Sequence, residues 1–161
     1  MKSRVLKRNH VREVMARYAM LPLRLVVGYG FLAHGLAKWS KGPAAFGSIL
    51  HAVGVPAPQL MAWTTIFVEI FGGAAILLGA FVALVSVPAI VLLVVAVFTV
   101  HLPYGFSSIK IVSFIGGRAQ FGPPGYECDL LYIVAILALA LSAPSPWSID
   151  AYRLRGEDVL A

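Results

Sequence analysis

The chain has 161 residues, of which 60% are hydrophobic and only 12% are charged, and its net charge is +6. In soluble domains about a quarter of the residues are charged, so this composition excludes an ordinary soluble domain and predicts a protein that lies in lipid. The single cysteine, Cys128, excludes an internal disulfide, a CxxC redox pair and a cysteine-rich metal site.

Residues 1–17 are polar and basic, and they carry six of the 13 lysine and arginine residues. Apolar residues recur among them at helical spacing. This pattern is typical either of a short helix on the membrane surface, before the chain turns inward, or of a frayed basic tail. The charge points to anionic lipid head groups and not to nucleic acid, because no aromatic-basic surface or binding motif accompanies it.

Four apolar runs follow, each close to the roughly 20 residues that a helix needs to cross a bilayer. They are residues 18–38, 60–79, 82–101 and 127–143. The pattern predicts an all-α fold, an integral membrane four-helix bundle over residues 18–143, with short interfacial helices and a tail over 144–161. A long external loop, residues 102–125, is expected between spans three and four, and its apolar character favours a lid that folds back over the end of the bundle.

The first span carries three residues that can hold a charge, Arg24, His34 and Lys38, and at 100° per residue they lie on one stripe of the helix. A charged side chain at the bilayer centre costs several kcal/mol unless it is paired or faces a wet cavity. The stripe should therefore face other helices. Gly28 and Gly35 on the same side would let a neighbouring helix approach closely.

The second span carries one carboxylate, Glu69, near its middle. Such a group either stays protonated or pairs with a cation. Arg24 lies about 7 or 8 Å lower in the bundle at 1.5 Å per residue, a distance that an arginine side chain can largely cover. We therefore expect an intramembrane ion pair between Arg24 and Glu69.

The basic residues outside the spans predict the orientation. With four spans, the side that holds both termini receives the six basic residues of 1–17 together with Arg153 and Arg155. The opposite side receives four, which are Lys38, Lys41, Lys110 and Arg118. Cytoplasmic segments carry the excess of Lys and Arg, so both termini are expected in the cytoplasm.

Ionisable residues from three spans are expected at one depth, near the outer ends of the helices. They are His34, Lys38, His101, Glu127 and Asp129. Histidines with carboxylates can bind a divalent metal, relay protons near neutral pH, or hydrogen-bond a ligand such as a quinone head group; they can also form a polar network without chemistry. No metal site is predicted, because no HxxxH or ExxH pair repeats on one helix.

These residues and their neighbours resemble the DoxX family of small bacterial membrane proteins over roughly residues 21–152. The resemblance rests on Arg24, His34–Lys38, Glu69, His101–Phe106, Phe121–Glu127 and Pro146–Asp150. It implies a four-helix, multi-pass protein of the bacterial inner membrane. By analogy with the DoxD subunit of thiosulfate:quinone oxidoreductase, it also implies redox work linked to the quinone pool.

The expected function is thus a quinone-linked oxidoreductase or a subunit of a membrane oxidoreductase complex. Two alternatives stay open at this point: a protein that binds or transports a small lipophilic molecule, and a non-catalytic membrane anchor for a soluble redox partner. No covalent cofactor is predicted, only quinone, because no residue set suits haem, flavin or an iron-sulfur cluster. The expected partners are the lipid bilayer, a soluble or membrane redox protein as electron donor, and a second copy of the chain.

Overall fold

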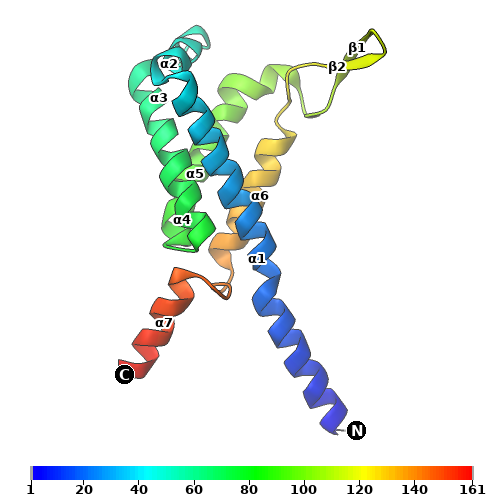
Figure 1. Cartoon of the computed structure of the whole chain (residues 1–161), viewed down its shortest axis with the longest axis vertical. Coiled ribbons are helices and arrows are strands. Elements are labelled where there is room, and N and C mark those ends of the chain that lie inside the picture. The colour runs from blue at the N-terminus through cyan, green and yellow to red at the C-terminus, as the bar shows by residue number, and fades with distance from the viewer. Residues whose placement is uncertain (1, 161) are drawn as a thin grey trace.

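A computed structural model describes the backbone of residues 2–160 and the side chains of residues 14, 15 and 18–155. The fold is mostly helical (Figure 1). The elements are, in order, α1 Lys2–Lys41, α2 Pro43–Ala52, α3 Pro58–Phe67, η1 Val68–Gly72, α4 Gly73–Leu78, α5 Val82–Ala96, η2 Val97–His101, η3 Leu102–Tyr104, β1 Ile111–Ile115, β2 Arg118–Phe121, α6 Glu127–Leu141 and α7 Ile149–Leu160. Two of the short elements, η1 and η2, are π-helical turns, and η3 is a 3-10 turn.

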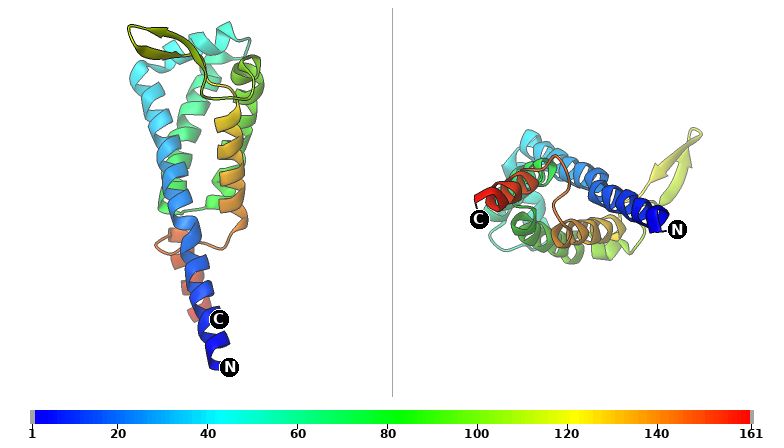
Figure 2. Two further views of the ribbon diagram at one scale, coloured as in Figure 1. Left: turned by 90° about the vertical axis from the view of Figure 1, so that its right-hand side faces the viewer. Right: turned by 90° about the horizontal axis from the view of Figure 1, so that it is seen from below.

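Three helical stretches among the described residues are long and apolar enough to cross a membrane: Tyr18–Lys41, Pro58–Leu78 and Val82–Tyr104. The second joins α3, η1 and α4 end to end, and the third joins α5, η2 and η3. Helix α6 packs against α5 and α1, and it runs back towards the end of the bundle at which the N-terminus lies (Figure 2). Its 15 residues span about 22 Å, against about 30 Å of hydrocarbon. A fourth crossing therefore stays a prediction.

Helix α1 is continuous from Lys2 to Lys41, with Pro22 inside it. The expectation that the chain turns, or loses helical structure, before the first span is therefore wrong. A proline near the middle of a helix removes one backbone hydrogen bond but does not interrupt α1 here. The first part of α1 extends beyond the other helices, and both termini lie at the same end of the molecule (Figure 1). We call this end the termini end and the opposite one, which bears α2 and the β strands, the hairpin end.

Glycines bring α1 into close contact with η1 and α4. A Cβ atom built on Gly28 would lie 2.5 Å from the backbone nitrogen of Leu77, and one on Gly35 would lie 2.7 Å from Cγ1 of Ile70. A Cβ on Gly73, in the facing helix, would lie 2.5 Å from the nitrogen of Leu32. The predicted close approach at Gly28 and Gly35 is confirmed, and it fixes the register between the two helices.

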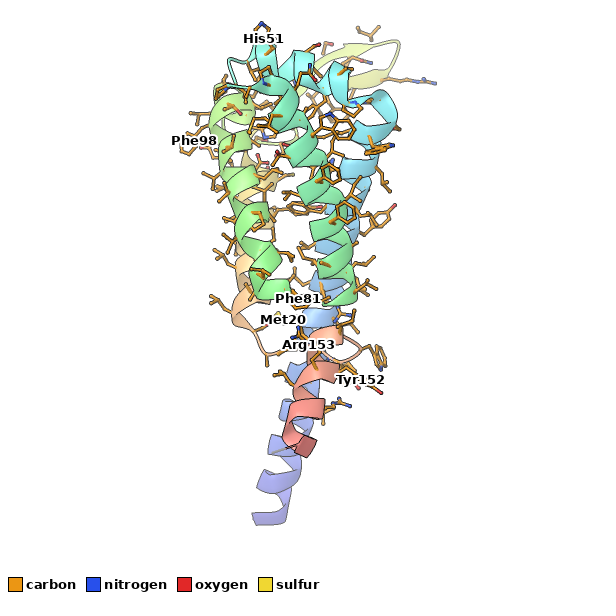
Figure 3. All side chains as sticks on the ribbon, turned by 90° about the vertical axis from the view of Figure 1, so that its left-hand side faces the viewer. Met20, His51, Phe81, Phe98, Tyr152 and Arg153 are labelled. Carbon is orange, nitrogen blue, oxygen red and sulfur yellow. The ribbon has the colours of Figure 1, made fainter. Side chains whose placement is uncertain are left out.

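The core lies between α1, α4, α5 and α6. Its buried members are Val27, Phe31, Ile76, Ala89, Ile136 and Leu139. Many other large apolar side chains are exposed on the outer surface of the helices, where Figure 3 shows Phe98 pointing away from the bundle. Such an outward-facing apolar surface is what a protein solvated by lipid requires.

The segment that follows η3 forms an antiparallel β hairpin with a Gly116–Gly117 turn. Its two strands are almost entirely exposed, and the hairpin projects sideways from the bundle (Figures 1 and 2). The lid predicted here is therefore wrong. Backbone hydrogen bonds at the base of the segment, from Gly125 N to Ser107 O at 3.0 Å and from Glu127 N to Phe106 O at 2.9 Å, bring its two ends together and direct the rest outward.

Candidate functional site: two ion pairs on π-helical turns

Glu69 lies in the π-helical turn η1 and is only 5% exposed. Its Oε1 atom accepts a hydrogen bond from Nζ of Lys38 in α1, and the two side chains form an ion pair. Gly35, one turn before Lys38, leaves room for Glu69, because a Cβ atom there would lie 2.9 Å from Cβ of Glu69. The Lys38 ammonium also lies 5.2 Å from the centre of the Phe46 ring, a distance suited to a cation–π contact.

The predicted pair between Arg24 and Glu69 is wrong. Arg24 donates from Nη1 to Oγ of Ser145 at 2.7 Å and from Nη2 to the carbonyl oxygen of Trp147 at 3.0 Å. The reason is the register of the two antiparallel helices, in which the glycine contacts place residue 28 opposite residue 77 and residue 35 opposite residue 70. In that register Lys38 is level with Glu69, whereas Arg24 lies beside Gly79, ten residues further along, or about 15 Å.

The second pair joins η2 to α6, and it is an ion pair when the histidine is protonated. Nδ1 of His101 lies 2.6 Å from Oδ2 of Asp129, and their side chains are 25% and 9% exposed. The carboxylate favours the tautomer whose proton is on Nδ1, which leaves the lone pair of Nε2 free. Among the described residues no hydrogen-bond partner of Nε2 is found. The pair is thus a histidine held by a carboxylate with one ring nitrogen open to a ligand or water.

The other two predicted residues are not part of these pairs. Glu127 accepts a hydrogen bond at 3.0 Å from the backbone nitrogen of Ser108, which holds the base of the hairpin segment. His34 is exposed on α1, next to Gly35. Within the described part of the chain, no three His, Cys, Asp or Glu side chains gather as a metal ion would need.

The π-helical turns are the feature that the sequence did not reveal. Glu69 lies within Val68–Gly72 and His101 ends Val97–His101, so each ion pair has one partner on a π-helical turn. Such turns are rare and are frequently found at functional sites. Each inserts a residue into an otherwise regular helix, and no composition or spacing in either span indicated it.

The termini end holds a separate polar cluster built around the segment between α6 and α7. The carboxylate of Asp150 accepts hydrogen bonds from the backbone nitrogens of Phe81 at 2.8 Å and Val82 at 3.0 Å, so it caps α5. Oγ of Ser148 accepts from the nitrogen of Ala151 at 3.1 Å and caps α7. The segment thus caps two helices at this end, α5 through Asp150 and α7 through Ser148.

Comparisons with known proteins place the chain in a family. The DoxX family model matches residues 19–102, just over half of the 161 residues. The chain is 28% identical over 137 residues, 82% of its length, to the uncharacterized membrane protein Rv3486 of Mycobacterium tuberculosis, of which the match covers 79%. No solved structure matches it. The chain belongs to the DoxX family.

Proposed function

We propose that the chain binds a quinone head group at the hairpin end and exchanges protons with it, as the membrane subunit of a quinone-linked oxidoreductase. The observation that carries the proposal is the His101–Asp129 pair, in which Nδ1 lies 2.6 Å from the carboxylate and Nε2 is open. A quinone carbonyl oxygen is a hydrogen-bond acceptor and its reduction consumes protons, so a histidine backed by a carboxylate suits both needs.

The chemistry assigns separate tasks to this chain and to its partner. Reduction of a quinone to a quinol takes two electrons and two protons. In its protonated form His101 donates from Nε2–H to one carbonyl oxygen and gives that oxygen one proton, while Asp129 holds the Nδ1–H group. Water supplies the second proton to the other carbonyl oxygen and reprotonates Nε2. The electrons come from a separate oxidoreductase, because the sequence, with its single cysteine, shows no residue set for haem, flavin or an iron-sulfur cluster.

A separate ion pair, Lys38–Glu69, joins α1 to η1. It holds α1 against η1 by a contact that is largely shielded from solvent at Glu69. The Oε2 atom of Glu69 is buried and has no hydrogen-bond partner among the described residues. A buried carboxylate oxygen without a partner is a costly feature that functional sites retain, and we assign it to proton movement within the hairpin end.

The test is the quinone content of the purified protein. The full chain is purified in a mild detergent, extracted with organic solvent, and its quinone is measured per mole of protein. We expect the wild type and His51→Ala, a control at an exposed position of α2, to retain quinone. His101→Ala and Asp129→Asn should retain about tenfold less, since removing one well-placed hydrogen bond costs about 1–2 kcal/mol. Undiminished quinone in His101→Ala would refute the proposal.

A second candidate function, an anchor for a soluble redox protein, is favoured by one observation. Helix α1 continues past the bundle at the termini end (Figure 1), and residues 2–17 of this extension are rich in Lys and Arg. A basic helix that projects beyond a membrane bundle can bind an acidic partner. Deletion of residues 2–17 should then release the partner in a pull-down while quinone content is kept, whereas retention of the partner would exclude this role.

If the wild type binds quinone and quinol analogues equally and no donor reduces the bound quinone, the chain is a binding or transport protein for small lipophilic molecules. That outcome keeps the site and removes the redox step.

A further inference from the structure

Arg24 is a cation inside the fold, at the termini end and far from the quinone site proposed above. It is 4% exposed, and no carboxylate among the described residues lies within salt-bridge distance of it. Its two described hydrogen bonds go to neutral oxygens, those of Ser145 and Trp147. A guanidinium has five N–H donors, and its Nε atom is buried with no partner among the described residues. Within the described part of the chain, the charge of this group is therefore not balanced by an ion pair.

A cavity of about 90 Å³ lies against Arg24 and is lined by both serines of the neighbouring segment, Ser145 and Ser148. One water molecule occupies about 30 Å³ of liquid, so the cavity holds a group of several non-hydrogen atoms. Asp150 also lines it, but each of its carboxylate oxygens already accepts a hydrogen bond from a backbone nitrogen at the start of α5. The partial positive charge of that helix end offsets the charge of Asp150.

The cavity adjoins a wider, open groove of about 420 Å³, with which it shares Met20 and Ser142–Pro144 as lining residues. The groove is otherwise apolar, with Pro146, Ala151 and Leu154, and has one cation, Arg155, among its lining residues. Arg153 lies over the Phe81 ring at 4.5 Å, and Figure 3 shows Met20, Phe81 and Arg153 at this end of the bundle. A small polar cavity with a buried cation, beside an apolar groove with a second cation, matches a ligand that has an anionic head and an apolar tail.

The depth of Arg24 fits the same ligand. A Cβ atom on Gly79 would lie 2.7 Å from Nη1 of Arg24, so the guanidinium lies at the turn between α4 and α5. This turn separates two candidate membrane spans, Pro58–Leu78 and Val82–Tyr104, and marks the edge of their apolar region. Lipid phosphates lie just outside the hydrocarbon, within the few ångströms between its edge and the outer limit of the head groups.

We propose that Arg24 and Ser145 bind a phosphate group, with the groove beside Leu154 and Arg155 receiving the apolar remainder of an anionic phospholipid. Ser148 lines the cavity without donating to the phosphate, because its hydroxyl already donates to the carbonyl oxygen of Ser145 at 2.7 Å. Arginine is the residue suited to this role, because its planar fork of donors matches phosphate oxygens. The site is independent of the proposed quinone site, so either can fail without the other.

The experiment measures thermal unfolding of the full chain in an uncharged detergent with three probes: dihexanoyl phosphatidylglycerol, inorganic phosphate and dihexanoylglycerol. We expect phosphatidylglycerol to raise Tm saturably and dihexanoylglycerol, which has the tail without the phosphate, to have no effect. A rise with phosphate alone, equal to that with phosphatidylglycerol, would show that the ligand is a free anion and that the groove is not used. No rise with either phosphate-bearing probe overturns the proposal.

Variants locate the site. Arg24→Gln should weaken phosphatidylglycerol binding about tenfold or more, because a charge-assisted hydrogen bond is about twice as strong as a neutral one. Arg155→Gln, at the exposed wall of the groove, should weaken it about two- to fivefold. Arg118→Gln, on the exposed hairpin at the opposite end, is the matched control and should bind as the wild type does. If Arg24→Gln fails to fold, Arg155→Gln and the three probes on the wild type still test the phosphate site. Equal affinity of wild type, Arg24→Gln and Arg155→Gln for phosphatidylglycerol would refute it.

Discussion

Removing Lys38 should destabilise the protein more than removing its partner does. In Lys38→Met the carboxylate of Glu69, 5% exposed, loses the cation with which it pairs. Breaking a buried ion pair on one side costs about 3–5 kcal/mol, and the lower end applies because about a quarter of the Lys38 side chain is exposed. For a chain of this size each kcal/mol shifts Tm by about 2–4 °C, so we expect Tm to fall by about 6–12 °C.

Removing the carboxylate of Glu69 should destabilise the protein less than removing Lys38. In Glu69→Gln the ammonium of Lys38 can turn towards water along its flexible stem, and the cost should be about 1 kcal/mol. The double variant Lys38→Met/Glu69→Met should recover most of the loss, because apolar residues of similar volume replace a buried ion pair at little cost.

The assay is thermal unfolding in one detergent at one scan rate, with Lys41→Met as the control, since Lys41 is exposed and in no ion pair among the described residues. Two results would refute the reasoning: a Tm of Lys38→Met equal to that of Lys41→Met, or a double variant that is no more stable than Lys38→Met.

Three further predictions concern packing, topology and capping. Gly73→Ala should lower stability by about 1–3 kcal/mol, because its Cβ would lie 2.5 Å from the backbone of α1. Gly72→Ala, with nothing within 4 Å of its Cβ, should be neutral or slightly stabilising. Equal losses of stability in the two variants, measured by thermal unfolding, would contradict the packing. A membrane-impermeant maleimide should label the exposed Cys128 from the periplasmic side of intact cells. A Cys128→Ser/Tyr152→Cys variant, with its new thiol at a position that is 82% exposed, should be labelled only after permeabilisation; labelling of both from one side would mean that α6 does not cross the membrane. Asp150→Ala should cost about 0.5–2 kcal/mol of stability through loss of the α5 cap, whereas Asp150→Asn, which keeps an acceptor, should cost less than half of this.

The sequence was sufficient for the parts of the fold that follow from composition and from local spacing. Apolar runs of the right length predicted the three candidate spans. The placement of Gly28 and Gly35 on one stripe predicted the close helix contact. These features are properties of single helices, and their physical causes, burial in lipid and the absence of a side chain, act within a few residues of the position that shows them.

The site was predicted less well, because it depends on the register between helices. Glu69 was correctly expected to pair with a cation of the first span. The predicted partner was Arg24, because heights were counted from the centres of two apolar runs, but the observed partner is Lys38. The count placed Arg24 about 7 or 8 Å from Glu69 in height, whereas the observed register separates them by about 15 Å, so an error of about five residues in the relative position of the two centres changed the partner. The true register is set by glycine contacts that only the packed helices reveal.

His101 and Asp129 were expected at one depth, and the structure joins them directly. The π-helical turns that carry Glu69 and His101 have no counterpart in the sequence pattern. The partners of Arg24 were also missed, because Ser145 and the carbonyl of Trp147 belong to an irregular segment whose path depends on tertiary contacts.

The measurement that tests the central claim most directly is the position at which a photoreactive quinone attaches to the protein. The full chain in lipid nanodiscs is illuminated with an azido-quinone, with and without excess unmodified quinone, and the labelled peptides are identified by mass spectrometry. We predict labelling, suppressed by competitor, on η2 and the first turns of α6 around His101 and Asp129. Labelling confined to the termini end around Arg24, or labelling that competitor does not reduce, would contradict the account.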